Sequence, residues 1–173
     1  ACDCGGKGRD YRKVRDQAAN IGTIAHAMIE ADIKGEAFDS SEYPPAEVDK
    51  AENAYLAWLE WSKGLGLETV ASEVQLVSEE YGFGGILDWV IRKNGGLWLV
   101  DFKSSKDIYQ EMIYQVAAYK ALWEEKEEAI KEVHILRLGK EDGTFSDHRL
   151  GDLAKAWNIF RHCLSIYQLQ KGG

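Results

Sequence analysis

The segment GGILDWVIRKNGGLWLVDFKSSK, residues 84–106, constrains the fold of this chain more than any other part of it. Its Asn-Gly-Gly at 94–96 is typical of a tight turn between two antiparallel strands, and apolar residues fill both flanks. Each predicted strand nevertheless carries a carboxylate, Asp88 and Asp101, and Lys103 follows the second. Charged groups are costly to bury unless they are paired or bind a metal ion, so the charges of this hairpin need an explanation.

Alternation along the second predicted strand places Asp101 and Lys103 on the same face. If the strands pair through the turn, Asp88 lies near Asp101, and adjacent carboxylates repel unless one is protonated or a cation lies between them. Oxygen ligands of this kind suit Mg²⁺ or Mn²⁺. Two interpretations stay open at this point: a divalent metal site, and a surface hairpin in which Asp101 and Lys103 form a weak ion pair.

The remaining patterns predict an α/β fold, a mixed sheet with helices packed on its faces. Apolar spacing predicts helices over residues 10–33, 46–63, 108–126 and 150–168. Apolar runs and alternation predict strands over residues 69–79, 86–92, 97–103 and 133–138. Thr23, directly after Gly22, is expected to cap a second segment and so interrupt the first helix. The length of 173 residues suits a single domain spanning residues 1–173.

The formal net charge of −8 argues against a protein that coats DNA through a broad basic surface. It leaves open a nucleic-acid enzyme whose basic groups are local. Residues 1–21 carry five basic side chains against three acidic ones. This basic start is typical of a solvated helix face, and an arm that contacts phosphates is the alternative.

Three cysteines, Cys2, Cys4 and Cys163, are an odd number, which favours free thiols over a disulfide framework. No second pair follows Cys2 and Cys4, so a zinc site is not expected there. No apolar run is long enough to cross a membrane, and no signal peptide is visible. We therefore expect a soluble, cytoplasmic protein with no membrane partner.

Four further residues are candidates for the same site, although each has an ordinary structural explanation. His26 lies on the first predicted helix, where a lone histidine is usually structural. Glu73 lies on the strand before the hairpin, where an exposed position is the alternative. Gln115 and Tyr119 share one face of the third predicted helix, and an amide and a phenol there suit a phosphate. Taken alone, Tyr119 is more typical of a core residue.

Five short motifs, taken in chain order, resemble those of the PD-(D/E)xK nuclease superfamily. They are G-x-x-x-H at 22–26, Glu73, G-x-x-D at 85–88, D-x-K at 101–103 and Q-x-x-x-Y at 115–119. The pattern is most similar to the RecB-like branch, which includes the RecB nuclease domain, CRISPR-associated adaptation exonucleases and phage recombination exonucleases. The motifs span residues 22–119, and the order of predicted elements extends the resemblance over most of the chain.

The resemblance implies a restriction-endonuclease-like core with a central mixed sheet of four strands. It implies a metal-dependent deoxyribonuclease that uses Mg²⁺ or Mn²⁺, an exonuclease acting in DNA recombination, repair or phage DNA processing. An endonuclease and a non-catalytic nucleic-acid-binding module of the same fold are the alternatives. The implied metal ligands are His26, Asp88, Asp101 and the carbonyl of Phe102. The implied catalytic residues are Asp88, Asp101, Lys103 and Glu73, and Gln115 and Tyr119 contact DNA.

Two departures from the family pattern have consequences. The third motif is D-x-K at 101–103, where many relatives have glutamate, so the shorter carboxylate could change the metal spacing. Several RecB-like relatives bind an iron–sulfur cluster through four cysteines, whereas this chain has only Cys163 near its C-terminus, so no cluster is expected. The expected partner is DNA, as single-stranded or double-stranded ends, and a homo-oligomer, such as a ring or dimer, stays open beside a monomer.

Overall fold

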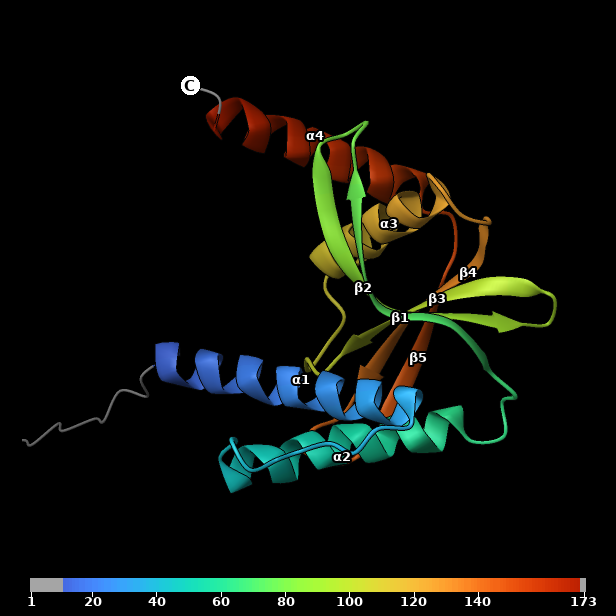
Figure 1. Cartoon of the computed structure of the whole chain (residues 1–173). Coiled ribbons are helices and arrows are strands. Elements are labelled where there is room, and N and C mark those ends of the chain that lie inside the picture. The colour runs from blue at the N-terminus through green and yellow to red at the C-terminus, as the bar shows by residue number, and fades with distance from the viewer. Residues whose placement is uncertain (1–10, 172–173) are drawn as a thin grey trace, which may run out of the picture.

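The computed structural model describes residues 11–171, which form a mixed five-stranded sheet flanked by four helices (Figure 1). Its elements are α1 (Tyr11–Lys34), α2 (Pro45–Ser62), β1 (Glu68–Ser78), β2 (Phe83–Lys93), β3 (Gly96–Lys103), α3 (Gln110–Glu124), β4 (Ile130–Leu138), β5 (Phe145–Leu150) and α4 (Ala154–Lys171). The strands lie in chain order, and the β3–β4 pair is parallel while the others are antiparallel. Helices α1 and α2 cover one face, α3 covers the other, and α4 packs on α3 (Figure 1).

The predicted α/β fold with a mixed sheet is confirmed, but the predicted number of four strands is wrong. The additional strand, β5, pairs antiparallel with β4 from Val133–Leu150 to Leu138–Phe145. Its sequence FSDHRL is mostly polar and its side chains are largely exposed, because β5 is an edge strand. It therefore lacks the apolar alternation by which a strand is predicted. The last helix consequently begins at Ala154 rather than at residue 150.

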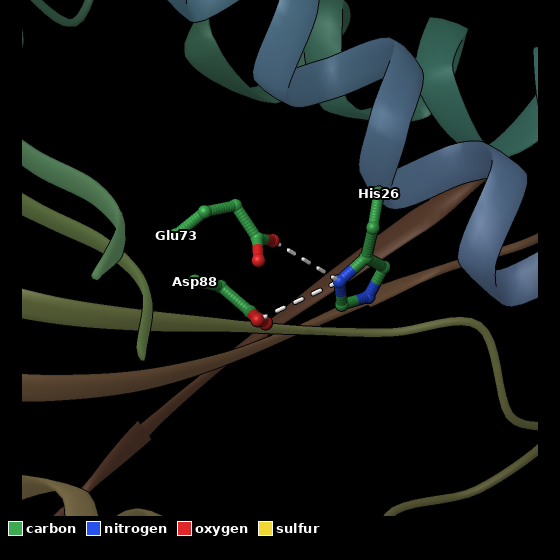
Figure 2. Close-up of side chains that lie close together, drawn as sticks. All are labelled: His26, Glu73 and Asp88. Atoms are coloured by element: carbon green, nitrogen blue, oxygen red, sulfur yellow. Dashed lines mark ion pairs between the residues drawn. The ribbon is translucent and has the colours of Figure 1, made fainter. Parts of the chain in front are cut away.

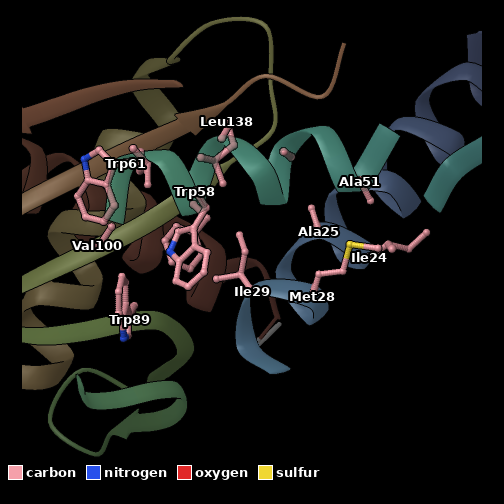
Figure 3. Packing of buried hydrophobic residues seen from close by; sticks show 14 of the residues in the cluster. Ile24, Ala25, Met28, Ile29, Ala51, Trp58, Trp61, Trp89, Val100 and Leu138 are labelled. Atoms are coloured by element: carbon pink, nitrogen blue, oxygen red, sulfur yellow. The ribbon is translucent and has the colours of Figure 1, made fainter. Parts of the chain in front are cut away.

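The first helix, α1, is continuous, so the predicted interruption at Thr23 is wrong. The Thr23 hydroxyl donates to the carbonyl of Ala19 within the helix, at 3.2 Å, instead of capping a new segment. The buried side chains of α1 follow helical spacing and form one apolar stripe: Ile21, Ile24, Ala25, Met28 and Ile29. This stripe packs in the core shared with α2 and the sheet (Figure 3).

Aromatic side chains join α2 to the sheet in the same core. Trp58 and Trp61 pack on Trp89 of β2, with ring centroids 5.7 and 6.4 Å apart (Figure 3). Trp89 in turn contacts Phe102 of β3 at 6.1 Å. These rings are buried, so the two α2 tryptophans belong to the core rather than to a partner surface. The aromatic cluster holds α2 against the middle of β2 and β3.

The strands β2 and β3 pair over only part of their length, and this feature positions the site. Their ladder runs from Lys93–Gly96 to Trp89–Val100 and then ends. From there β2 continues with β1 alone as far as Phe83, while β3 continues beside β4 as far as Lys103. Asp88 and Asp101 therefore lie where the two strands diverge rather than within a shared ladder.

Some sequence-based expectations fall outside this description. Cys2, Cys4 and the basic side chains that precede Arg15 lie outside the part of the chain whose side chains the structure describes. Cys163 on α4 is exposed and its thiol is free. Within residues 11–171, no helix has both the length and the apolar character required to cross a membrane.

Replacing Ile29 by alanine is expected to lower the free energy of unfolding by about 2–5 kcal/mol, because its side chain is fully buried beneath α1. The matched control is Leu56→Ala on α2, since Leu56 is 56% exposed and its truncation should change the free energy of unfolding by about 0.5 kcal/mol or less. Urea unfolding followed by circular dichroism measures both. Equal losses in the two variants would contradict the described packing of α1.

Candidate active site

The backbone of Phe102 is the centre around which the candidate site is built. Because β2 has left β3, the Phe102 N–H has no strand partner there and donates to Asp88 Oδ2 at 2.7 Å. The Phe102 carbonyl oxygen lies 3.1 Å from Nε2 of His26, which reaches it from α1. Side chains from β2 and α1 thus satisfy backbone groups of β3 that a continuous ladder would have paired.

The contact with Phe102 also determines the tautomer of His26. A carbonyl oxygen only accepts hydrogen bonds, so Nε2 of His26 must carry the hydrogen. In the neutral ring, the lone pair is then on Nδ1. Nδ1 lies 3.5 Å from Asp88 Oδ1 and 3.9 Å from Glu73 Oε1 (Figure 2). The three side chains converge from α1, β1 and β2.

Glu73 reaches this cluster through an unusual backbone conformation. Its φ of +46° lies in the left-handed region, although Glu73 is inside strand β1. The ladder pairs Ser72 with Trp89 and Val74 with Leu87, so Glu73 lies opposite Asp88 between these two pairs. A non-glycine residue in this region costs about 1–3 kcal/mol, and such strain is found mainly at functional sites.

A second line of contacts runs from Asp101 to α3. Asp101 Oδ2 lies 2.7 Å from the Lys103 ammonium, but this oxygen has no hydrogen bond of good geometry. Lys103 Nζ donates to Gln115 Oε1 at 2.9 Å, and Gln115 Nε2 donates to the Tyr119 hydroxyl at 2.9 Å. Lysine can only donate, so the amide orientation is fixed by its partner. The Tyr119 oxygen accepts from Gln115, which leaves its own hydrogen available to another group.

The cluster of His26, Glu73 and Asp88 and the line of contacts from Asp101 to Tyr119 open into one cavity of about 490 Å³. Seven of the predicted side chains lie in its wall: His26, Glu73, Asp88, Asp101, Lys103, Gln115 and Tyr119. Phe102 contributes its backbone beneath them. The wall also contains Gly22, Thr23, Ala27, Glu30 and Ile86, for which no role at the site was predicted. Glu30 forms an ion pair with Lys34, and Ile86 is 43% exposed on β2, a position that apolar alternation does not distinguish from core.

Two glycines of the predicted motifs allow close approaches at this cavity. A Cβ added at Gly85 of β2 would lie 2.5 Å from Cε1 of Tyr119, so only glycine leaves room for this ring against the strand. A Cβ added at Gly22 of α1 would lie 3.0 Å from Oγ of Ser104, which follows β3. The glycines thus fix how closely α3 and α1 approach the sheet on either side of the acidic groups.

The electrostatic environment opposes the charged form of the carboxylates. Burial raises the pKa of Asp101 to about 7, and the Asp88 carboxylate adds to the rise while the Lys103 ammonium opposes it. Burial also raises the pKa of Glu73, again with a contribution from Asp88. Burial lowers the pKa of His26, but the Asp88 carboxylate beside Nδ1 outweighs this effect and the pKa is raised overall. A cation placed among these groups would reverse each shift.

The donor atoms at this position fit a divalent metal ion. Nδ1 of His26 and one carboxylate oxygen each of Glu73 and Asp88 lie within 4.8 Å of one another. Carboxylate oxygens are common ligands of hard divalent cations, and an imidazole nitrogen is a common ligand of transition-metal ions. Asp101 is not within this group of three, and the Phe102 carbonyl is turned towards His26, so their roles as ligands stay predictions. The buried Asp101 Oδ2 has no hydrogen bond although it lies near the Lys103 ammonium, so it keeps a free acceptor position.

Comparison with known proteins gives a family and a similar fold for this chain. A sequence model of the PD-(D/E)XK nuclease superfamily matches residues 6–152 of the chain. A solved structure with a similar fold is that of a protein from Eubacterium rectale, which is provisionally named an exonuclease. The two structures superpose with a TM-score of 0.56 and 16% sequence identity. The match covers 89% of this chain and 65% of that one, so this chain spans less than two thirds of that protein. No curated protein sequence matches this one.

The affinity for Mn²⁺ is expected to rise about tenfold between pH 6 and pH 8. The reason is that the Asp101 carboxyl, with a pKa of about 7, must lose its proton before its negative charge can attract a cation. The raised pKa values of Glu73 and His26 act in the same direction. Calorimetric titration in two buffers of different ionisation enthalpy measures both the affinity and the protons released. An affinity that is constant or falls over this range would contradict the electrostatic description.

Replacing His26 by alanine should weaken Mn²⁺ binding, since the variant loses the nitrogen donor nearest to Asp88. The matched control is His162→Ala, because His162 is exposed on α4 and does not line the cavity. The same titration compares the two variants with the unchanged protein. Equal affinities in His26→Ala and His162→Ala would remove His26 from the ligand set.

Proposed function

The chain belongs to the PD-(D/E)XK nuclease superfamily, and from this premise we propose that it is a metal-dependent deoxyribonuclease that hydrolyses phosphodiester bonds. One observation carries the proposal: the His26–Glu73–Asp88 cluster and the line of contacts from Asp101 to Tyr119 open into the same cavity. The first group suits a cation and the second suits a phosphate.

The charge of the cavity explains why a cation is needed. Among the described residues, its wall contains four carboxylates, those of Glu30, Glu73, Asp88 and Asp101, against one lysine, Lys103, and the His26 imidazole. A phosphodiester would be repelled by this wall on its own. A bound Mg²⁺ or Mn²⁺ would supply the Lewis acid, lower the pKa of a bound water and neutralise the phosphoryl charge. The residues present therefore favour metal-dependent hydrolysis over direct acid–base catalysis.

Lys103 lies in the middle of the line of contacts from Asp101 to Tyr119. Its ammonium lies between the Asp101 carboxylate and the Gln115 amide, and both contacts hold it at the edge of the cavity. From there it can orient a water molecule or stabilise the negative charge that develops on the phosphate. Its side chain is only 19% exposed, so the charge acts in surroundings that water screens less than bulk solution does.

Tyr119 and Gln115 suit the role of phosphate contacts. Burial raises the pKa of Tyr119 to about 12, with the carboxylates of Asp101 and Asp88 adding to the rise, so the phenol stays protonated at neutral pH. Because its oxygen accepts from Gln115, its hydrogen can be donated to a phosphate oxygen in the cavity. Neither group competes for the cation as a carboxylate would.

We further propose that the nuclease acts as an exonuclease on DNA ends, in recombination, repair or phage DNA processing. This refinement rests on the similarity of the five ordered motifs to the RecB-like branch. The provisional naming of the Eubacterium rectale protein as an exonuclease is consistent with it. End-labelled DNA distinguishes the alternatives: mononucleotide release indicates an exonuclease, and a cut in a covalently closed circle indicates an endonuclease.

Lys103→Met should reduce Mn²⁺-dependent DNA hydrolysis by about 10²- to 10³-fold, because it removes the positive charge nearest the predicted phosphate position. The matched control is Lys106→Met, three residues later and exposed outside this cavity, which should retain the activity of the unchanged protein. The assay uses end-labelled single- and double-stranded DNA with Mg²⁺, Mn²⁺ or EDTA. Full activity in Lys103→Met, or hydrolysis that persists in EDTA, would overturn the proposed mechanism.

A further inference from the structure

A second cavity, of about 400 Å³, adjoins the candidate active site. The two cavities share Gln115 and Tyr119 in their walls, so α3 forms the boundary between them. On its far side the second cavity is closed by Phe83 at the start of β2 and by Phe160 of α4. The two cavities are therefore adjacent across Gln115 and Tyr119.

Aromatic rings dominate the wall of the second cavity. Phe83, Tyr114, Tyr119 and Phe160 all line it, and each is partly exposed. Phe83 and Phe160 contact each other with ring centroids 4.9 Å apart, and Phe160 stacks on Trp157 at 5.8 Å. These contacts hold the two phenylalanine rings in place before any ligand arrives. Fixed, partly exposed rings provide faces on which a planar group can stack.

The charges around this second cavity exclude a phosphate as its occupant. Among the described residues that line it there is no lysine or arginine, and Glu111 is the charged side chain present. A phosphate there would meet a carboxylate and no counter-charge, whereas an uncharged planar group would meet rings and a backbone glycine, Gly84. The volume lies within the range of about 300–1,000 Å³ that is typical of ligand sites.

We propose that the second cavity binds an unpaired nucleobase of the DNA strand whose phosphate lies in the active site. The inference rests on the proposed function, since it takes the phosphate position from that site. Phosphate and base are covalently adjacent in a nucleotide, as the two cavities are adjacent across Gln115 and Tyr119. A base that stacks on Phe83 or Phe160 must leave its pairing partner, so the substrate class is a single strand or an unpaired end.

Abasic substitution tests this assignment. Binding of labelled single-stranded oligothymidylates, each with one abasic nucleotide at a different position, is measured by fluorescence anisotropy with Mn²⁺. The Lys103→Met background is used because hydrolysis is expected to be about 10²- to 10³-fold slower there. One position should lose affinity by about 5- to 150-fold, which is the size of one base–aromatic stacking contact. In Phe83→Leu and Phe160→Leu this position-specific loss should disappear, because leucine keeps an apolar side chain but offers no ring.

The matched control is Phe145→Leu, since Phe145 is an exposed phenylalanine on β5 that does not line the second cavity. It should keep the full position-specific loss. Tyr114→Leu is a further variant of the cavity wall, for use if a phenylalanine variant fails to fold by circular dichroism. The inference would be overturned if one abasic position lowered the affinity equally in the protein without a wall substitution and in all wall variants. It would also be overturned if no abasic position lowered the affinity.

A thiol probe gives an independent measurement. Cys163 also lines the second cavity and is exposed, and replacing Cys2 and Cys4 by serine leaves it as the only thiol. Saturating oligothymidylate should slow the alkylation of Cys163, and the oligonucleotide with the sensitive position made abasic should not. Equal alkylation rates with and without the intact oligonucleotide would contradict occupancy of this cavity.

The two proposals fail in distinguishable ways. If the protein hydrolyses DNA but no abasic position affects binding, the nucleobase site is wrong and the nuclease assignment stands. If position-specific binding is lost in the wall variants but no metal ion supports hydrolysis, the binding site stands and the nuclease assignment is wrong. If the protein neither binds nor hydrolyses these oligonucleotides, both proposals are overturned.

Discussion

The hydrogen bond from the Phe102 N–H to Asp88 is the interaction on which the candidate site depends. It forms because β2 and β3 separate after Trp89 and Val100, which leaves a backbone donor of β3 without a strand partner. The same separation exposes the Phe102 carbonyl to His26. One interruption in the sheet therefore orients a carboxylate from β2 and an imidazole from α1 together. Buried backbone groups require partners, so both side chains are held in place before any ligand binds.

The site contains two buried carboxylates, and a single ion pair cannot neutralise both of them. Asp88 and Asp101 are buried near each other, and Lys103 supplies one positive charge for the pair. Burial is the largest cause of the raised pKa values of Asp101 and Glu73, and the Asp88 carboxylate adds to both. The same carboxylate raises the pKa of His26 against the effect of burial. An acidic chain with a net charge of −8 can therefore act on a polyanion only where a cation reverses the local sign.

The sequence predicted those parts of the molecule that local chemistry determines. The Asn-Gly-Gly turn specified the central hairpin, and the ordered motifs identified seven side chains that line one cavity. The edge strand β5 was missed because an exposed polar strand carries no apolar alternation. The point at which β2 separates from β3 depends on how β1 and β4 pair with them. A local sequence pattern does not predict pairing between such distant segments. The left-handed backbone of Glu73 and the position of Ile86 in the wall follow from that pairing and could not be predicted either.

The position of Gln115 connects the site that would bind phosphate to the cavity that would bind a base. Its amide accepts from Lys103 on one side and donates to Tyr119 on the other, and its orientation is fixed by Lys103, which can only donate. The Tyr119 ring lies against Gly85 of β2, where a larger residue would displace it. Two hydrogen bonds therefore join the Tyr119 hydroxyl to the Lys103 ammonium through the Gln115 amide. The wall of the aromatic cavity and the Lys103 ammonium are thus connected through two side chains on a single turn of α3.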